Sequence, residues 1–458
     1  MNPERVADHT GLTHRQDRDS EPRRVLMVSP HFPPDTSAAT HRVRLLAPHL
    51  AGYGWDPTVV TVDPRDYEGR LDDDLLGLVA PSLRVVRCRA WSPRQTRRMG
   101  IGDLGLRAFC GLFRACRTLL RERRWDVLFI TTHPVYPAML GPLLKARFGI
   151  PFVVDYQDPW IGAWGRSVGG GRNGTPDVKS RLSRAAARVL EPIVVRSTDG
   201  ITAVSEGTYA QLVARYRDVY AKPWAELPVG GDPGDFEFLR AHPRPNRFFD
   251  RGDGDVHVGA VGTVLPMGRK TLEAVLTAVT LIRRRRPELY RRLRLHFFGT
   301  SNQTAADAAP RVLPLAQDLG IADRVTEIAP RIDYVDALAV HADASALLLM
   351  GSSEPHYTAS KLYPALFARR PLLAVFHEAS SVVGILRRVG PAAGVRLVVY
   401  DESAPVGSKV EEIASHLSGM LESGPCEAPG IDLEALKDVS APALAGRLAE
   451  MFDRVTRR

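Results

Sequence analysis

Residues 23–34, RRVLMVSPHFPP, begin as an apolar run typical of a buried strand and break off in a loop rich in proline. A helical pattern follows at 40–54, and a second strand-like run, DPTVVTV, follows at 56–62. This unit of strand, loop, helix and strand recurs at 125–160 and again at 180–205. Apolar strands that alternate with helices indicate a buried parallel sheet with helices on both faces.

The same alternation resumes in the second half of the chain, after a segment at 222–254 that is rich in Pro, Gly and Asp. Such a segment is typical of a linker between domains. The predicted fold class is α/β, with two doubly wound, Rossmann-like domains at 23–221 and 255–425 that face each other across a cleft. We interpret 1–22 as a disordered tail and 426–458 as a helical segment that can pack back on the first domain. Open parallel sheets bind ligands at the C-terminal ends of their strands, so the cleft is the expected site.

Composition narrows the class of protein without choosing its ligand. The net charge is 61 − 52 = +9, which favours anionic partners such as nucleotide phosphates, acidic lipid headgroups or nucleic acid. Four cysteines show neither a CxxC motif nor the spacing of zinc ligands, which is typical of a reduced, intracellular protein. We find no apolar leader and no run of about 18–20 apolar residues. We therefore expect a cytoplasmic protein that is soluble or lies on a membrane surface.

Lysine is rare in this chain, and two of its predicted helix starts carry one. Arg269 and Lys270 open the helix that follows Gly262, and Lys361 follows Ser360, which can cap another helix. Free N–H groups at a helix start attract anions, and a compact ammonium group suits a phosphate oxygen. These positions are therefore candidates for holding a diphosphate. A solvated pair on a helix is an equally good interpretation of Arg269 and Lys270 alone.

Polar side chains also follow the predicted strands of the first half. His133 comes directly after one strand, and Asp155 and Asp158 stand at the end of the next. Parallel strands bring such loops to one edge of the sheet, which makes the three residues candidates for catalysis. A lone loop histidine is just as often structural, and an Asp before Pro and Trp can simply cap a turn.

Several short motifs together resemble the GT-B glycosyltransferases of the family 4 type, the retaining class that uses nucleotide sugars. The resemblance spans about residues 23–425. The motifs that carry it are VSPHFPPDTSAATHR at 28–42, VDYQDPW at 154–160, LPVGGDPGDF at 227–236, VGTV at 261–264 with GRK at 268–270, HFFG at 296–299 and SKLYPALFARRPLLAV at 360–375.

The resemblance implies which residues hold the donor and which face the sugar. The donor diphosphate would lie on Lys361 and on Arg269 or Lys270, while His133 would lie near the reacting centre. Asp158 would accept a hydrogen bond from the acceptor hydroxyl. Asp155 is expected to be a catalytic residue beside His133 and Asp158. The other residues expected to contact the donor are Gly262, Thr263, Arg331, Glu354, Ser360 and Tyr363, together with Thr36, Ser37 and Ala38 of the first loop.

Two departures from the family pattern concern the donor. Many relatives carry a Glu that holds the donor ribose shortly after Ser-Lys-Leu, whereas Tyr363 and Pro364 occupy that place here. Glu354 is the nearest acid upstream. Relatives often have a Gly-Gly pair in the first loop, where this chain has Thr, Ser, Ala and Ala at 36–39. The ribose contacts and the identity of the donor are therefore open, while the diphosphate contacts are kept.

The sequence predicts neither a metal ion nor another cofactor. Asp-x-Asp occurs within DDD at 72–74 and GDGD at 252–255, and we interpret both as solvated polar loops. Enzymes of the fold that the chain resembles typically stabilise the leaving diphosphate with basic groups and helix N-termini.

A basic segment at 94–125 has apolar residues at helical spacing. Arginines flank this stripe at Arg107, Arg114, Arg117 and Arg121. The pattern suits a helix that lies on an anionic membrane surface. A helix that packs in the core and exposes a basic face is the slightly favoured alternative. We see no aromatic-interleaved basic strand or recognition motif, so nucleic acid is not an expected partner.

These observations predict a metal-independent glycosyltransferase of the hexosyltransferase type, with retention implied by the resemblance alone. It would move a sugar from a nucleoside diphosphate donor to a hydroxyl of a sugar, a lipid-linked saccharide or a natural product. Envelope polysaccharide or glycoconjugate biosynthesis, at the inner membrane face, would be its setting. Two alternatives stay open: a nucleotide-sugar epimerase or hydrolase of the same fold, and a non-catalytic partner subunit.

Overall fold

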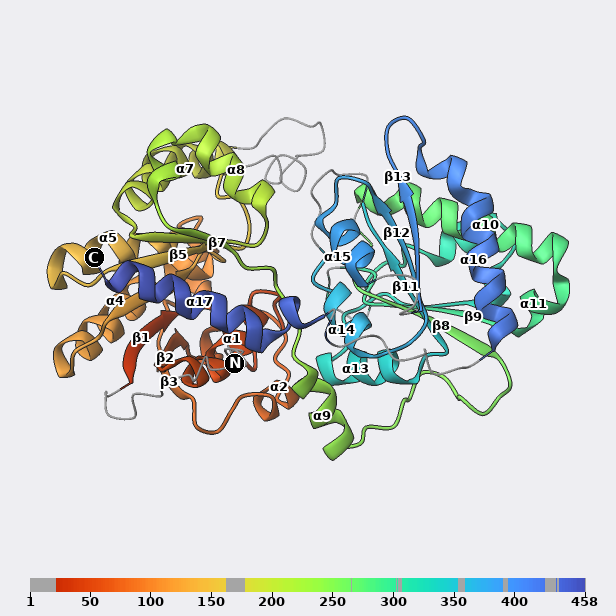
Figure 1. Ribbon diagram of the computed structural model, residues 1–458, viewed down its shortest axis with the longest axis horizontal. Helices are drawn as coiled ribbons and strands as arrows, with labels where there is room; N and C mark the ends of the chain where they lie inside the picture. The colour runs from red at the N-terminus through yellow and green to blue at the C-terminus, as the bar shows by residue number, and fades with distance from the viewer. Residues whose placement is uncertain are drawn as a thin grey trace, which may run out of the picture.

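The protein folds into two α/β bodies that lie side by side (Figure 1). The computed structural model describes residues 22–161, 178–264, 266–301, 303, 307–352, 359–389, 394–424, 434 and 436–457. The tail predicted at 1–22 lies outside the described residues except for its last position. The prediction of two doubly wound α/β domains is confirmed by the two parallel sheets.

The first domain is built on a seven-stranded parallel sheet in the order β3-β2-β1-β4-β5-β6-β7. The strand order reverses between β1 and β4, which is where open sheets of this kind hold their ligands. The strands are β1 (Arg23–Val28), β2 (Trp55–Val62), β3 (Arg84–Cys88), β4 (Val127–Thr131), β5 (Phe152–Tyr156), β6 (Gly200–Ala203) and β7 (Trp224–Glu226).

The second domain is built on a six-stranded parallel sheet in the order β10-β9-β8-β11-β12-β13. Its strand order reverses between β8 and β11. The strands are β8 (Val256–Val261), β9 (Leu293–Phe298), β10 (Val325–Ile328), β11 (Ala346–Met350), β12 (Leu372–His377) and β13 (Val395–Tyr400). In β11, Leu348 and Leu347 enter core clusters on opposite faces of the sheet, which explains why the whole strand is apolar.

Helices cover both faces of each sheet (Figure 1). Those of the first domain are α1 (Thr40–Leu46), α2 (Asp74–Gly77), α3 (Pro93–Arg98), α4 (Leu104–Glu122), α5 (Leu140–Phe148), α7 (Val178–Ser197) and α8 (Glu206–Arg215). The others are α9 (Pro233–Ala241), α10 (Arg269–Arg285), α11 (Pro287–Arg292), α12 (Leu313–Asp318), α13 (Tyr334–Asp343), α14 (Leu362–Phe367), α15 (Ser381–Val389), α16 (Val410–Ser423) and α17 (Ala441–Thr456).

The chain crosses between the two domains twice. The linker predicted at 222–254 is partly regular structure, because its first residues form β7, which pairs with β6. The chain returns at its end, where α17 packs on the first domain (Figure 1). Phe452 of α17 lies against Trp55 with ring centroids 5.1 Å apart, in a cluster that includes strand β1. Because the chain crosses back, its last helix, α17, is part of the core of the first domain.

Helix α4 packs in the core of the first domain. Its apolar residues Leu112, Cys116 and Leu119 are buried in the cluster under β1 and β4, so the stripe at 94–125 does not face outward. Arg107, expected on the basic flank, is buried and donates to the carbonyls of Trp91 and Asp66. Among the described helices, none combines the length and the apolar character of a membrane span.

Candidate functional site

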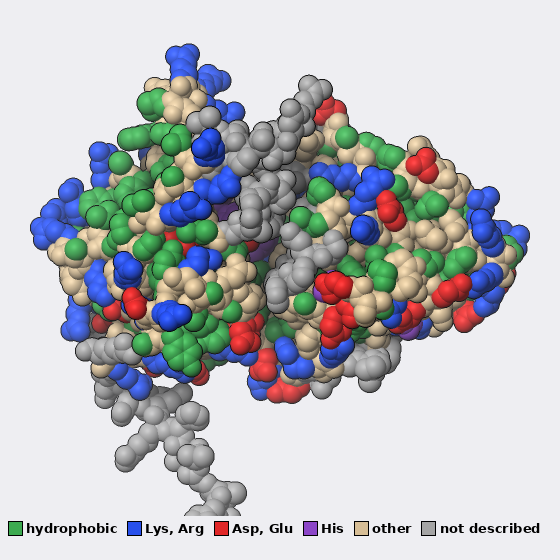
Figure 2. Space-filling model, turned by 90° about the horizontal axis from the view of Figure 1, so that it is seen from above, with side chains coloured by type: hydrophobic (Ala, Val, Ile, Leu, Met, Phe, Trp, Pro, Cys, Tyr) green, Lys and Arg blue, Asp and Glu red, His purple; other side chains and the backbone are tan. Residues whose placement is uncertain are grey.

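A cavity of ≈ 340 Å³ lies between the two domains. Figure 2 shows the hollow between the two halves, with histidine side chains visible inside it. Thr36 and Ala38 of the first loop line the cavity from one side, and the ends of β8 and β9 line it from the other. The segment 229–236 and helices α13 and α14 complete the wall. The cavity therefore joins the C-terminal edges of both sheets, where ligands of such folds bind.

Lys361 reaches this cavity from the start of α14, beside the end of β8. Gly262 has a φ of 124°, and a Cβ at this position would lie 2.9 Å from Lys361 Cδ. Glycine thus makes room for the lysine side chain. Lys361 Nζ has no hydrogen-bond or ion-pair partner among the described residues. Loss of water around the ammonium lowers the pKa of Lys361 to about 8, a cost that a bound anion would offset.

A small recess connects Lys361 to the start of helix α10. Its lining includes Thr263, Gly268 and Gly351. Gly268 is the N-cap of α10 and no side chain caps this helix. The first amide groups of a helix lack partners within the helix, so they can donate to an anion held by Lys361. Lys361, Gly262 and the start of α10 thus bring an ammonium group and free amide groups together, a combination that favours an anion.

Arg269 and Lys270 do not line this cavity or the recess. Both side chains are exposed, and Arg269 Nε forms an ion pair with Glu273 at 2.8 Å. The cause is the phase of α10, which buries Thr271 and Leu272 against the sheet and turns the two preceding residues to solvent. The expected basic pair is therefore not assembled from these residues. The second cation at the cavity is Arg331.

Arg331 ties the second domain to the first loop. Its Nη1 donates to the carbonyl of Thr36 at 2.9 Å, and both residues line the cavity. Arg70, whose Nη2 lies 2.8 Å from Asp333, adds an ion pair between the domains beside this contact. The first loop thus lies directly against the second domain at the cavity.

Asp155 is a structural residue in this fold. It is fully buried, accepts a hydrogen bond from Thr202 Oγ1 and lies 3.1 Å from Arg42 Nε. Arg42 in turn donates to the carbonyls of Leu227 and Pro228, just before the segment that lines the cavity. The carboxylate of Asp155 therefore helps to hold that segment, and it does not line the cavity.

Two Asp–His pairs follow neighbouring strands of the first sheet. His133 Nδ1 lies 3.2 Å from Asp158 Oδ2 in the loops after β4 and β5, and this carboxylate raises the pKa of His133. In the first loop, after β1, His31 Nδ1 lies 2.6 Å from Asp35 Oδ2. The rings of His31 and His133 have centroids 6.1 Å apart. The structure thus brings the predicted His133 and Asp158 together with a pair that the sequence did not single out.

The remaining predicted residues divide between the cavity and its surroundings. Thr263 and Ser360 line the cavity. Lys361, not Ser360, is the N-cap of α14, and no side chain caps that helix. Tyr363 is buried against Gly231 rather than exposed in the cavity, and Ser37 bonds to Asp35. Glu354 lies outside the described residues.

A buried contact between the domains, formed by Arg44, Asp235 and Tyr334 and called the clamp below, was not predicted. Arg44 of α1 forms two hydrogen bonds of 2.7 and 2.8 Å with Asp235 of α9, and Tyr334 of α13 donates to the same carboxylate at 2.8 Å. His41, one turn before Arg44, packs on the Tyr334 ring with centroids 4.5 Å apart. Asp235, Tyr334 and His41 all line the cavity. Asp235 lies in the motif LPVGGDPGDF, but nothing in the sequence marked it as a partner of Arg44.

Two buried histidines, His296 and His341, and the partly buried His41 are expected to make the fold sensitive to acid. Burial lowers the pKa of His296 and His341 to about 4 and that of His41 to about 3. Between the ordinary pKa of about 6.5 and these values the unfolded chain binds more protons, so stability falls as the pH drops. We expect each histidine to cost up to about 2 kcal/mol at pH 5 relative to pH 7.5. Urea unfolding at both pH values, with His296→Phe showing a smaller loss, checks this; equal stability would contradict it.

Comparisons with known proteins give one family match and a set of structures with a similar fold. Residues 37–230 match the family described as glycosyl transferase 4-like domain. No curated protein sequence gives a significant match. A glycosyltransferase from Rickettsia africae is similar in structure, with a TM-score of 0.57, 11% identity, and coverage of 95% of this chain and 99% of that one.

Two further solved structures are similar over nearly the whole chain. HepE of Anabaena, in complex with UDP and glucose, has a TM-score of 0.58, 13% identity, and coverage of 94% of this chain and 99% of that one. An alpha,alpha-trehalose-phosphate synthase (UDP-forming) from Burkholderia vietnamiensis has a TM-score of 0.56, 9% identity, and coverage of 94% and 99%. At these identities the likeness establishes the shared two-domain fold.

Proposed function

Because residues 37–230 belong to the glycosyl transferase 4-like family and the whole chain has the GT-B fold, we propose that the protein transfers a sugar from a nucleoside diphosphate donor to a hydroxyl acceptor. The observation that carries the proposal is the ammonium of Lys361, which has no partner among the described residues and lies beside Gly262 and the start of α10, at the strand-order reversal of the second sheet. A diphosphate supplies the anion that this place favours.

The mechanism follows from the two sides of the cavity. Lys361 and the amides at the start of α10 stabilise the charge that develops on the departing diphosphate, which lowers the barrier to cleavage of the sugar–phosphate bond. The first-domain loops with His133 and Asp158 meet the sugar and its acceptor from the other side. Retention of the anomeric configuration is what the resemblance implies, with the departing phosphate deprotonating the incoming hydroxyl.

The finer parts of the proposal rest on the resemblance and on charge. The sugar transferred is a hexose, no metal is required, and the acceptor is a saccharide, free or lipid-linked, or a natural product, within envelope polysaccharide or glycoconjugate synthesis. Arg114, Arg117 and Arg121 remain exposed on α4 and can face an anionic membrane surface. Since the apolar stripe of α4 is buried, any such attachment is electrostatic and is expected to weaken with salt.

Turnover of nucleotide sugars tests the proposal. The full chain is incubated with UDP-, GDP-, dTDP- and ADP-glucose and the matching galactose and mannose donors, with and without simple sugar acceptors, and the release of nucleoside diphosphate is measured. We expect release from one class of donor, and a product in which the sugar is bound to the acceptor. Epimerised donor as the sole product would favour an epimerase, and no turnover of any donor would favour a partner subunit.

A further inference from the structure

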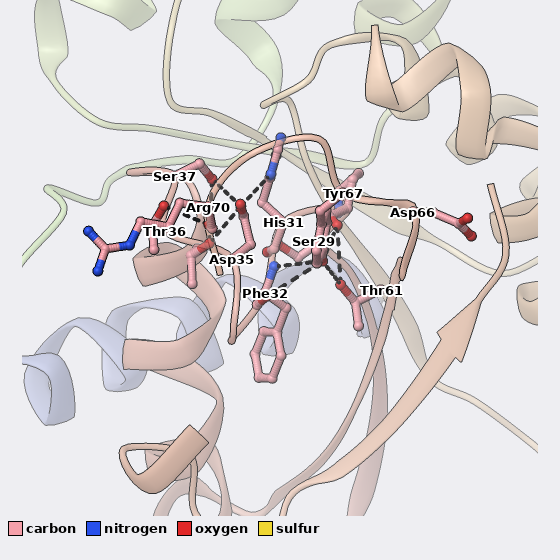
Figure 3. Close-up of polar contacts among 12 residues, drawn as sticks. Ser29, His31, Phe32, Asp35, Thr36, Ser37, Thr61, Asp66, Tyr67 and Arg70 are labelled. Atoms are coloured by element: carbon pink, nitrogen blue, oxygen red, sulfur yellow. Dashed lines mark hydrogen bonds and ion pairs between the residues drawn. The ribbon is translucent and has the colours of Figure 1, made fainter. Parts of the chain in front are cut away.

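The first loop holds an Asp–His pair in a fixed arrangement (Figure 3). Asp35 Oδ2 lies 2.6 Å from His31 Nδ1 and also accepts hydrogen bonds from Ser37 Oγ at 2.6 Å and Thr40 Oγ1 at 3.1 Å. Asp35 is 4% exposed, and the hydrogen bonds from His31, Ser37 and Thr40 lower its pKa in spite of burial. The carboxylate is thus ionised and cannot turn away.

This arrangement fixes the tautomer of His31. An ionised carboxylate only accepts, so His31 Nδ1 carries a hydrogen, and a ring with this single hydrogen has Nε2 left as an acceptor. Tyr67 stacks on the same ring with an interplanar angle of 8°, which restrains its rotation. His31 Nε2 has no partner among the described residues. Figure 3 shows this second nitrogen turned away from Asp35 and from the rest of the loop.

The position of the pair suits a substrate. His31 follows β1 and His133 follows β4, the two strands between which the order of the first sheet reverses. The same loop reaches the cavity a few residues later, where Thr36 meets Arg331 of the second domain. His31 therefore lies where the strand order of the first sheet reverses, in the loop whose later residues Thr36 and Ala38 line the cavity.

We propose that neutral His31 accepts a hydrogen bond at Nε2 from the reacting hydroxyl of the acceptor, and that Asp35 holds the ring in the tautomer and orientation this requires. The proposal rests on the proposed function. It assigns the loop after β1 a part in catalysis that differs from donor binding, namely the orientation of the attacking oxygen. His133, which pairs with Asp158 at 3.2 Å, lies beside His31 with ring centroids 6.1 Å apart.

The test compares Asp35→Asn and His31→Gln with Asp253→Asn. Asp253 also pairs with a histidine four residues away, His257 at 3.0 Å, but at the start of β8, the opposite end of the second sheet from the cavity. We measure release of nucleoside diphosphate from UDP-, GDP-, dTDP- and ADP-glucose into water, and calorimetric binding of the free diphosphates. The two first-loop variants are expected to lose about 10- to 100-fold in release and to keep diphosphate affinity, while Asp253→Asn changes neither.

A second measurement needs no substrate. NMR spectra of the imidazole nitrogens are recorded on the full chain with nitrogen-labelled histidine. The signal of His31 is the one that is absent from the spectrum of His31→Gln. We expect this signal to show the tautomer with the hydrogen on Nδ1. The opposite tautomer would overturn the assignment, as would variants that keep the wild-type rate of release. A wild type that binds no diphosphate and releases none would overturn the proposed function together with it.

Discussion

Replacement of Lys361 by alanine is expected to weaken the binding of nucleoside diphosphate by about 10- to 100-fold, since a hydrogen bond to a charged group contributes roughly 1.5–3 kcal/mol. Folding should be preserved, because Lys361 Nζ has no partner among the described residues and its desolvated charge is lost with the substitution. Isothermal titration calorimetry with the diphosphate that binds the wild type measures the effect.

Lys270→Ala is the matched control. Lys270 is also a lysine near a helix start of the second domain, but its side chain is exposed and lines neither the cavity nor the recess. We expect its affinity to stay within about twofold of the wild type, as for a remote charge screened by salt. A large loss in Lys270→Ala with none in Lys361→Ala would place the diphosphate outside the recess and reject the site.

Asp235→Ala is expected to destabilise the protein by about 3–5 kcal/mol, because it leaves the buried guanidinium of Arg44 without its carboxylate. The side chains of Arg44 and Asp235 are only 2% and 6% exposed, and Tyr334 loses its acceptor as well. Since these residues come from α1, α9 and α13, the loss should also loosen the contact between the domains. Chemical unfolding followed by fluorescence measures the change.

Glu411→Ala is the control for this second prediction. Arg285 and Glu411 form an equally short two-fold ion pair, at 2.6 and 2.9 Å, but both side chains are more than half exposed. Its loss should change the stability far less than the loss of Asp235 does, because water and salt screen an exposed ion pair. The double variant Arg44→Met with Asp235→Leu should recover most of the stability. Equal small losses in Asp235→Ala and Glu411→Ala would show that the clamp does not hold the domains.

The pattern of apolar strands and helices was enough to predict the fold. Runs such as ALLLM in β11 are apolar at every position because both faces are covered, and this pattern is distinctive. The return of α17 to the first domain rests on contacts with residues about 400 positions earlier, such as Trp55 with Asp453. Local sequence predicts a helix there, but the partner of that helix depends on the assembled surface.

The sequence predicted residues of the candidate site only at positions where few residue types would serve. Lys361 stood out because lysine is rare in this chain, and Gly262 because strand ends that contact a ligand or side chain often require glycine. Asp155 and Arg269 were placed wrongly for opposite reasons. Burial turned Asp155 into an ion-pair partner of Arg42, and the phase of α10 turned Arg269 outward. Both outcomes depend on packing between segments far apart in the chain.

The central claim is that Lys361 holds the diphosphate of a nucleotide donor, and calorimetric titration of UDP, GDP, dTDP and ADP into the wild type at about pH 7.5 and about pH 9.5 tests it most directly. The pKa of Lys361 near 8 predicts that one diphosphate binds at the lower pH, and about tenfold or more weakly at the higher pH, with uptake of a proton. Lys361→Arg, which stays charged, should abolish this pH dependence. No binding of any diphosphate at millimolar concentration, or binding with equal affinity at both pH values, would contradict the account.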